Sequence, residues 1–215
     1  RVLNFPADFN SSLVAVSFPS DIQRIYFGNE YRAHQYPDGT QVKILYRNSL
    51  FDQPIDNVNW PDNLRALDFG GSFNKPVNRM RWPPRLTDLH LSISFNQSVE
   101  DVIWPRTLQS LSFGYSFNKA IDRVQWSTQL KYLALGARFN RRIDRVAWPN
   151  QLVRIDFGKR FNQPLAGVQL PTDLKFVYFG NRFNQPIDEV SWPDKLLLLA
   201  FGKRFDFPMK SLHWP

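Results

Sequence analysis

Cysteine is absent from the 215-residue sequence, which excludes disulfide bonds, thiolate metal sites and a cysteine nucleophile. The three histidines, His34, His90 and His213, lie far apart in the sequence, so no histidine cluster indicates a metal site. No apolar run approaches the roughly 18 residues that span a bilayer, and neither a glycine-rich phosphate loop nor a dinucleotide-binding fingerprint occurs. We therefore expect no membrane span, no metal and no cofactor.

What the sequence does contain is a 22-residue period, seen most cleanly over residues 183–204 (FNQPIDEVSWPDKLLLLAFGKR). Such self-similarity predicts a stack of near-identical coils, each in contact only with its neighbours. Every tryptophan obeys the period, and Leu170 stands in the one slot where a tryptophan is missing. The phenylalanines in register are Phe51, Phe73, Phe95, Phe117, Phe139, Phe161, Phe183 and Phe205, and the tryptophans are Trp60, Trp82, Trp104, Trp126, Trp148, Trp192 and Trp214.

We expect residues 1–215 to form a single solenoid, because a repeat array is one body whatever its length. The segment 31–50 is an aberrant coil of only 20 residues, and its Tyr-Pro-Asp-Gly stretch predicts a local bulge or kink. Both ends of the sequence fall inside a repeat, which favours a segment of a longer array or one completed by another chain. The coils begin near residues 9, 31, 51, 73, 95, 117, 139, 161, 183 and 205.

The second half of each coil predicts a β-strand. It reads L-x-x-L-x-F-G, and in the coil from residue 51 Leu67 and Phe69 alternate with residues 66 and 68. This alternation is typical of a strand with one face in the core and one face outward. Because about one coil joins each strand to the next, the strands must run parallel, about 4.8 Å apart.

The first half of each coil, F-N-Q-P-I-D-x-V-x-W-P, has proline in two slots and cannot hold a regular helix. We expect its apolar residues to point inward, and a short second strand near residues 57–60 and their equivalents. The predicted fold is a leucine-rich-repeat-like solenoid: a curved stack of 22-residue coils with one parallel β-sheet, a mostly irregular opposite side and almost no α-helix.

The recurring phrase FNQPI…WP…L…L-x-FG resembles the FNIP variety of leucine-rich repeats over about residues 9–215. This resemblance implies a curved solenoid with a protein-binding role, often beside an F-box or another domain. The 20-residue segment at 31–50 departs from the family pattern. The resemblance therefore implies an architecture more than a particular activity.

The net charge of +8 is concentrated toward the C-terminus. Residues 1–130 carry 13 Lys/Arg against 12 Asp/Glu, whereas residues 131–215 carry 14 against 7. One slot of the repeat holds serine in the coils from 51 to 116 and arginine in the next four coils. The serines are Ser72, Ser94 and Ser116; the arginines are Arg138, Arg160, Arg182 and Arg204, with Lys159 and Lys203 beside them.

The arginine row has two interpretations. Like charges about 4.8 Å apart repel by roughly 0.9 kcal/mol even in water, so the row costs stability and brings no packing of its own. Either an anionic partner binds there, or the side chains splay apart and the row is a solvated rim. A basic surface confined to one region favours a partner with an acidic surface.

The outward face of the predicted sheet is the second candidate surface. Apolar and aromatic residues gather there near the arginine row, and patches edged by charge usually mark protein interfaces. The alternatives are that a second element covers this face, or that the strands face the opposite way and these residues point inward. The predicted partner-binding residues are Tyr132, Arg138, Arg154, Lys159, Arg160, Phe176, Tyr178, Arg182, Leu198, Lys203 and Arg204.

Two further columns carry polar side chains. The asparagine that follows each in-register phenylalanine predicts a hydrogen-bonded ladder at a buried turn. Asp68, His90 and Ser112 align on adjacent strands in the order of a hydrolase triad. Such a triad needs an oxyanion hole and a pocket that excludes water, and an open sheet predicts neither.

We therefore expect a non-enzymatic scaffold that binds another protein through the sheet face and the basic rim of residues 130–204. Two alternatives remain open at this stage. The first is an anion binder for nucleic acid, acidic glycan or anionic lipid, although few aromatic residues remain to stack on bases. The second is a structural subunit of a large assembly or virion that self-associates through its uncapped ends.

Overall fold

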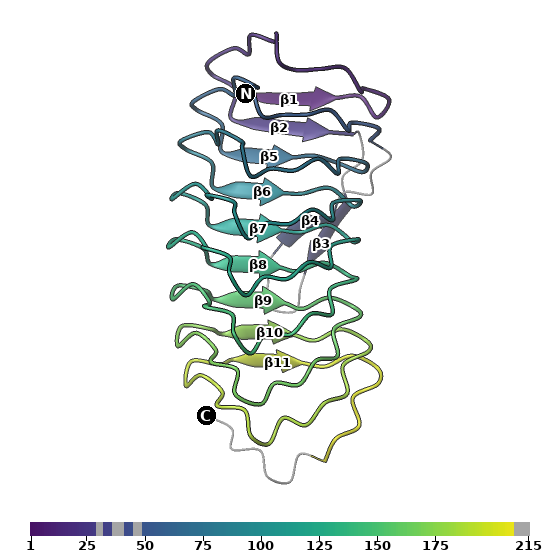
Figure 1. Ribbon diagram of the computed structural model, residues 1–215, viewed down its shortest axis with the longest axis vertical. Coiled ribbons are helices and arrows are strands. Elements are labelled where there is room, and N and C mark those ends of the chain that lie inside the picture. Colours follow the sequence, from purple (N-terminus) through teal and green to yellow (C-terminus); the bar gives the residue numbers. More distant parts are fainter. Residues whose placement is uncertain (29–31, 36–40, 45–48, 209–215) are drawn as a thin grey trace.

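The sheet of this protein contains nine parallel strands stacked in one direction (Figure 1). The computed structural model describes residues 1–28 and 49–208, together with the strand backbones at 32–35 and 41–44. No helix occurs among these described residues. In sheet order the strands are β1 (Val2–Phe5), β2 (Arg24–Phe27), β5 (Ala66–Asp68), β6 (Asp88–His90), β7 (Ser110–Ser112), β8 (Tyr132–Ala134), β9 (Arg154–Asp156), β10 (Phe176–Tyr178) and β11 (Leu198–Ala200).

The register of the sheet confirms the 22-residue coil. Leu67 pairs with Leu89, and Leu89 pairs with Leu111 on the following strand. Identical positions therefore lie side by side on adjacent strands from β5 to β11. Any chemical property that recurs in one slot of the repeat consequently becomes a row along the stack.

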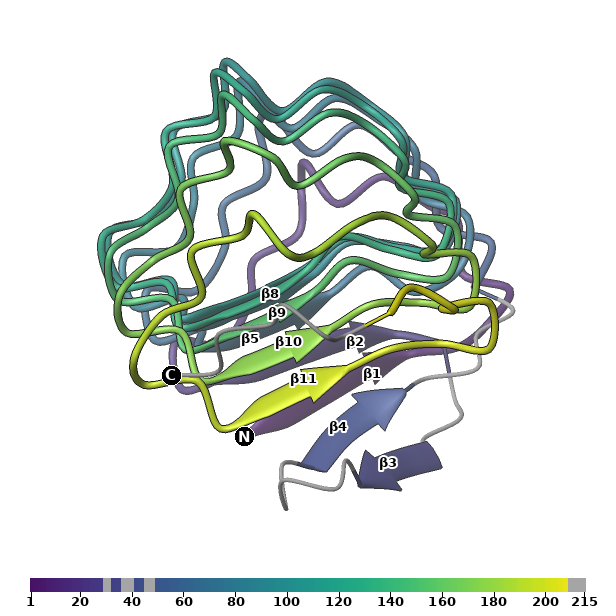
Figure 2. The ribbon, with the colours of Figure 1, turned by 90° about the horizontal axis from the view of Figure 1, so that it is seen from below.

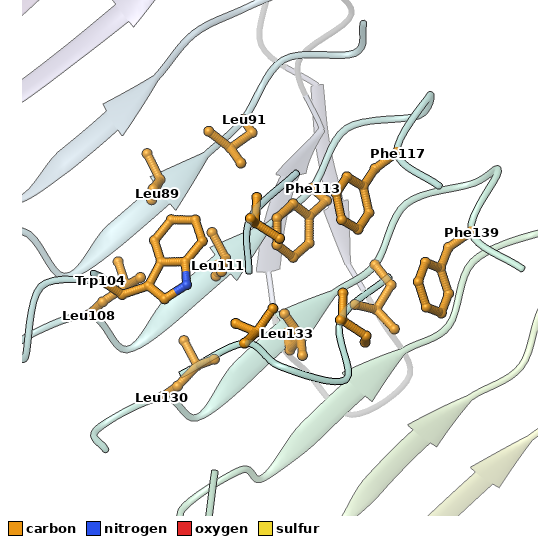
Figure 3. Packing of buried hydrophobic residues seen from close by; sticks show 14 of the residues in the cluster. Leu89, Leu91, Trp104, Leu108, Leu111, Phe113, Phe117, Leu130, Leu133 and Phe139 are labelled. Atoms are coloured by element: carbon orange, nitrogen blue, oxygen red, sulfur yellow. The ribbon is translucent and has the colours of Figure 1, made fainter. Parts of the chain in front are cut away.

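The core is made of columns of apolar side chains inside the coils (Figure 3). Phe113 stacks on Phe117 with ring centroids 4.1 Å apart, and Trp104 meets the edge of Phe113 at 6.3 Å. Trp104 also stacks on Trp82 of the preceding coil at 5.6 Å, as the period predicts. Because each ring packs on rings of the next coil, the apolar area that is buried adds coil by coil.

The side of the coil opposite the sheet is irregular, as expected, and the extended piece near residues 57–60 does not pair as a second strand. Residues 57–60 form a turn and an extended segment without strand pairing. Here the chain is held by local turns, such as Val58 N–H to Ile55 O at 3.2 Å and Leu64 N–H to Pro61 O at 3.0 Å. Proline cannot donate a ladder hydrogen bond, and its recurrence favours such turns over strand pairing.

Residues 32–35 and 41–44 do not join the main sheet, although the sequence predicted a coil that begins near residue 31. Strand β2 pairs directly with β5, across 42 residues of sequence, and Asp52 N–H donates to Asn10 Oδ1 at 2.9 Å across the same gap. Between them, β3 (Arg32–Gln35) and β4 (Gln41–Ile44) pair antiparallel as a separate two-stranded sheet. The predicted bulge at Tyr-Pro-Asp-Gly lies outside the described residues.

The β3–β4 hairpin lies on the outer face of the main sheet, opposite the irregular side of the coils (Figure 2). In Figure 1 it stands at the level of β7 and β8, several coils away from β2. A second element therefore does lie over part of the outward face, which was one of the alternatives to an open sheet surface.

Candidate interaction surface

The turn that follows each strand is tightly packed against the preceding coil. Gly158 has a φ of 78°, and a Cβ built there would lie 1.9 Å from the carbonyl oxygen of Gly136. Only glycine tolerates both this backbone conformation and this close approach. The next residues, Lys159 and Arg160, form the exposed corner of the coil.

Backbone hydrogen bonds fix the arginine slot in register from coil to coil. Arg138 N–H donates to Tyr115 O at 2.9 Å, Arg160 N–H to Ala137 O at 3.0 Å, and Arg182 N–H to Lys159 O at 3.2 Å. The four arginines of this slot and the two lysines beside them are all exposed. We call Arg138, Arg160, Arg182 and Arg204 the arginine row.

The arginine row is a concentration of positive charge with little internal compensation. Among the described residues, none of its four guanidinium groups forms an ion pair with a carboxylate. The Arg138 guanidinium carbon lies 5.4 Å from the centroid of the Tyr115 ring, a cation–π contact at the first coil of the row. The row can therefore supply planar donor groups to carboxylates or phosphates.

The asparagine ladder runs beside this row and confirms the predicted hydrogen bonding. Asn162 N–H donates to Asn140 Oδ1 at 2.9 Å, and Asn184 N–H donates to Asn162 Oδ1 at 2.8 Å. The ladder is not buried as expected, because Asn140 and Asn184 are exposed and Asn162 is half-buried. Each Oδ1 accepts a hydrogen bond within the ladder, and among the described residues the side-chain NH2 groups of Asn140, Asn162 and Asn184 remain as further donors.

The sheet face differs from the predicted open surface mainly in the burial of Arg154. Arg154 is only 5% exposed, and its guanidinium carbon lies 4.4 Å from the centroid of the Tyr178 ring. Phe176, Tyr178 and Leu198 are half-buried, whereas Tyr132 is 40% exposed. Arg154 therefore belongs to the packing of this face, which corrects its expected place as an exposed contact residue.

Of the aligned Asp68, His90 and Ser112, the first and the last make local contacts with the backbone of the turn that follows their own strand. Asp68 is 4% exposed, and its Oδ1 accepts the N–H of Gly70 at 3.0 Å. The Ser112 hydroxyl contacts the carbonyl oxygen of Phe113 at 3.5 Å. The aspartate thus caps the turn that ends its own strand, a common role of aspartate at turns.

Sequence reasoning missed two basic residues that extend the positive surface. Arg141 and Arg142 replace the usual Gln-Pro of the repeat, and this replacement was the available signal. Arg141 Nε–H donates to Asn118 O at 2.9 Å, while Arg142 forms an exposed ion pair with Asp144 at 3.0 Å. The hydrogen bond from Arg142 lowers the pKa of the Asp144 carboxyl and raises that of the guanidinium.

A polar depression of about 350 Å³ lies beside this ion pair. Its lining residues are Asp122, Arg142, Asp144 and Arg145. Across the described part of the chain, no group of three His, Asp or Glu side chains is arranged to hold a metal ion. The same residues include no helix of the length and apolar character that a membrane crossing requires.

The stacked parallel strands and 22-residue coils define a leucine-rich-repeat-like solenoid. The profile of the FNIP Repeat family matches residues 51–94 and 161–204, so these two segments carry FNIP repeats. The structure is also similar to the crystal structure of CroV588, described as a novel circular LRR protein, with a TM-score of 0.60 and 25% sequence identity. That alignment covers 95% of this chain and 34% of CroV588, so this chain spans about a third of its length. No curated protein matches the sequence.

These matches establish the kind of protein but name no ligand. FNIP and leucine-rich repeats are generally non-enzymatic repeat scaffolds, and solenoids of this kind typically serve as protein-interaction modules.

Proposed function

We propose that this protein is a non-enzymatic scaffold that binds an acidic surface of another protein through the arginine row. The observation that carries the proposal is the row itself: four exposed arginines in one slot of four successive coils, with no carboxylate partner among the described residues. Because the same slot is filled by serine in three other coils of the same fold, the stack does not require arginine there.

The chemistry of the row supports a partner with carboxylates. Each guanidinium offers a planar fork of donors that fits a carboxylate in a bidentate manner. A row of like charges raises the electrostatic free energy of the unbound protein, and an acidic partner would relieve that repulsion. Steering by a positive patch also raises association rates. Lys159 and Lys203 enlarge the field on the same corner of the coils.

Charge reversal within the row tests the proposal. Arg160→Glu with Arg182→Glu should weaken binding of fluorescent poly-glutamate by about tenfold or more, because two attractive contacts become repulsive. Fluorescence anisotropy in dilute buffer measures the dissociation constant, and added salt should weaken the binding of the unmodified protein.

The matched control reverses two exposed arginines outside the row, Arg81→Glu with Arg106→Glu, which changes the net charge by the same amount. This control should lower the affinity by less than about threefold, through the overall charge alone. An equal loss in both double variants would show that net charge, rather than the row, attracts the ligand. Tryptophan fluorescence checks that each variant is folded, since the core contains stacked tryptophans.

A further inference from the structure

Three consecutive coils repeat the triplet Arg-Phe-Asn at the same corner: residues 138–140, 160–162 and 182–184. In each triplet the phenylalanine is fully buried, whereas both polar neighbours face away from the core. Every coil therefore presents a guanidinium and, two residues further on, a carboxamide NH2 group. We call these six residues, together with Arg204, the donor strip.

We propose that the donor strip binds one short acidic peptide segment in an extended conformation, which lies along the stack axis across four coils. This inference rests on the proposed function and specifies the form of the partner. The guanidinium groups bind alternate acidic side chains of the segment, and the asparagine NH2 groups donate to its backbone carbonyls.

Spacing supports an extended segment of about five residues. Successive coils are about 4.8 Å apart, so the four arginines span about 14 Å along the stack. In an extended chain, alternate side chains point to the same side and recur about every 6.7 Å, so three of them span about 13 Å. A helix of the same charge pattern would leave the asparagine donors without acceptors, because helical carbonyls bond within the helix.

Two features of the strip favour a short peptide over a nucleic acid. Binders of single strands combine positive grooves with aromatic platforms. Tyr115 lies beside the row, and its ring already carries the Arg138 guanidinium at 5.4 Å. In the last coil Asp206 replaces the asparagine, and its exposed side chain places a carboxylate where a longer polyanion would continue.

The experiment varies the number of arginines in the row and the length of the peptide, and measures how the affinity depends on both. Two capped peptides of alternating glutamate and serine serve as probes, one of five residues with three glutamates and one of seven with four. Ser116→Arg adds a fifth arginine to the row, because Ser116 N–H already makes the same backbone bond, to Ile93 O at 2.9 Å. The substitution should tighten binding of the seven-residue peptide about threefold, the range of one exposed ion pair.

The affinity of the five-residue peptide should rise no more than about twofold with Ser116→Arg, since the longer row offers this peptide only one additional position. The control is Ser191→Arg, which adds the same charge at an exposed position in the irregular half of the coil. Ser191→Arg should not raise the affinity for one peptide more than for the other. Equal gains for both peptides with Ser116→Arg, or equal gains from the two variants, would overturn the extended, in-register segment.

Nitroxide labels on the peptide test the direction in which it lies. A label at one end should broaden amide signals of the coil at Arg138, and a label at the other end those of the coil at Arg204. If both labels broaden the amide signals of the same coils, the inference is overturned. It is also overturned if an oligothymidylate of equal charge binds more tightly than the peptide. If charge reversal still abolishes poly-glutamate binding in that case, the proposed function stands; if it does not, both fail.

Discussion

The coils from residues 51 to 116 and those from 117 to 204 share one scaffold. One slot of the repeat holds serine in the first group and arginine in the second. Ser94 N–H bonds to Gly71 O at 3.0 Å in the first region, and Arg160 N–H bonds to Ala137 O at 3.0 Å in the second. The asparagine ladder also runs through both, with 2.8 Å from Asn96 N–H to Asn74 Oδ1. We call the first the serine region and the second the arginine region.

This comparison separates the residues that build the stack from those that it merely carries. The phenylalanine that follows the slot is fully buried in both regions, as at Phe95 and Phe161, so packing fixes its identity. The residue in the slot is held to the preceding coil by a hydrogen bond of its backbone N–H. The fold therefore accepts either a small neutral or a long charged side chain there. A residue type that the fold does not dictate is therefore the best source of functional information in this repeat.

The turn before the slot differs in one coil of the serine region, whereas Gly70 and Gly114 keep the usual glycine in the other two. In the serine region Ser92 takes the place of the usual glycine, fully buried, with its hydroxyl bonded to the carbonyl oxygen of Phe73. In the arginine region Gly158 has a positive φ and contacts the preceding turn directly. In both regions the turns that keep glycine therefore have no room for a side chain.

The largest effect should come from breaking such a turn. Gly158→Ala should lower the free energy of unfolding by about 3 kcal/mol or more, because the added Cβ meets the Gly136 carbonyl and the φ is unfavourable for alanine. Ser92→Ala, in the serine region, should cost only about 1–2 kcal/mol through the lost buried hydrogen bond. Urea unfolding followed by tryptophan fluorescence compares the two.

Lys159→Ala is the control for Gly158→Ala, since it changes the next, exposed residue and leaves the turn intact. It should alter stability by less than about 0.5 kcal/mol. A loss of stability for Gly158→Ala no larger than that of this control would contradict the close approach between the two turns.

The repeat, the parallel strands and the buried columns could be predicted from the sequence because each depends on local periodicity. Alternation around Leu67 gives the strand, and the in-register phenylalanines give the stack. The arginine row followed from the same period, because identical slots become neighbours whenever coils stack. Its exposure is confirmed by the structure.

The hairpin and the state of Arg154 could not be predicted in this way. Residues 41–44 alternate like a strand of the stack, and only pairing between β2 and β5 shows that the segment leaves it. The shortened spacing of 20 residues and the Tyr-Pro-Asp-Gly stretch were the signals of the change. Burial of Arg154 depends on contacts across the sheet face, including the Tyr178 ring, and a one-dimensional pattern contains no information about them.

A smaller effect should follow from converting the arginine region toward the serine region. Arg160→Ser removes one charge from between two like charges, so it should raise the free energy of unfolding by about 0.5–1 kcal/mol at low salt. At about 1 M salt the Debye length is about 3 Å, and the gain should vanish. The reciprocal change, Ser94→Arg, places one arginine between two serines and should leave stability nearly unchanged. A gain for Arg160→Ser that persists in high salt would contradict repulsion as its cause.

The smallest effect concerns Arg142. It fills the slot of the repeat that holds Pro54 and Pro76 in the serine region. Its hydrogen bond lowers the pKa of Asp144, so Arg142→Gln should raise that pKa toward the ordinary aspartate value, and carboxyl carbon NMR titration measures the shift. A carboxyl whose pKa is lower in the folded state adds stability above its unfolded pKa, and this contribution is lost as pH falls through the folded value. Acidification should therefore remove a small stabilisation from the unmodified protein that Arg142→Gln already lacks. An unchanged pKa in the variant would show that Arg145 or the local backbone, rather than the Arg142 fork, holds the carboxylate in its charged form.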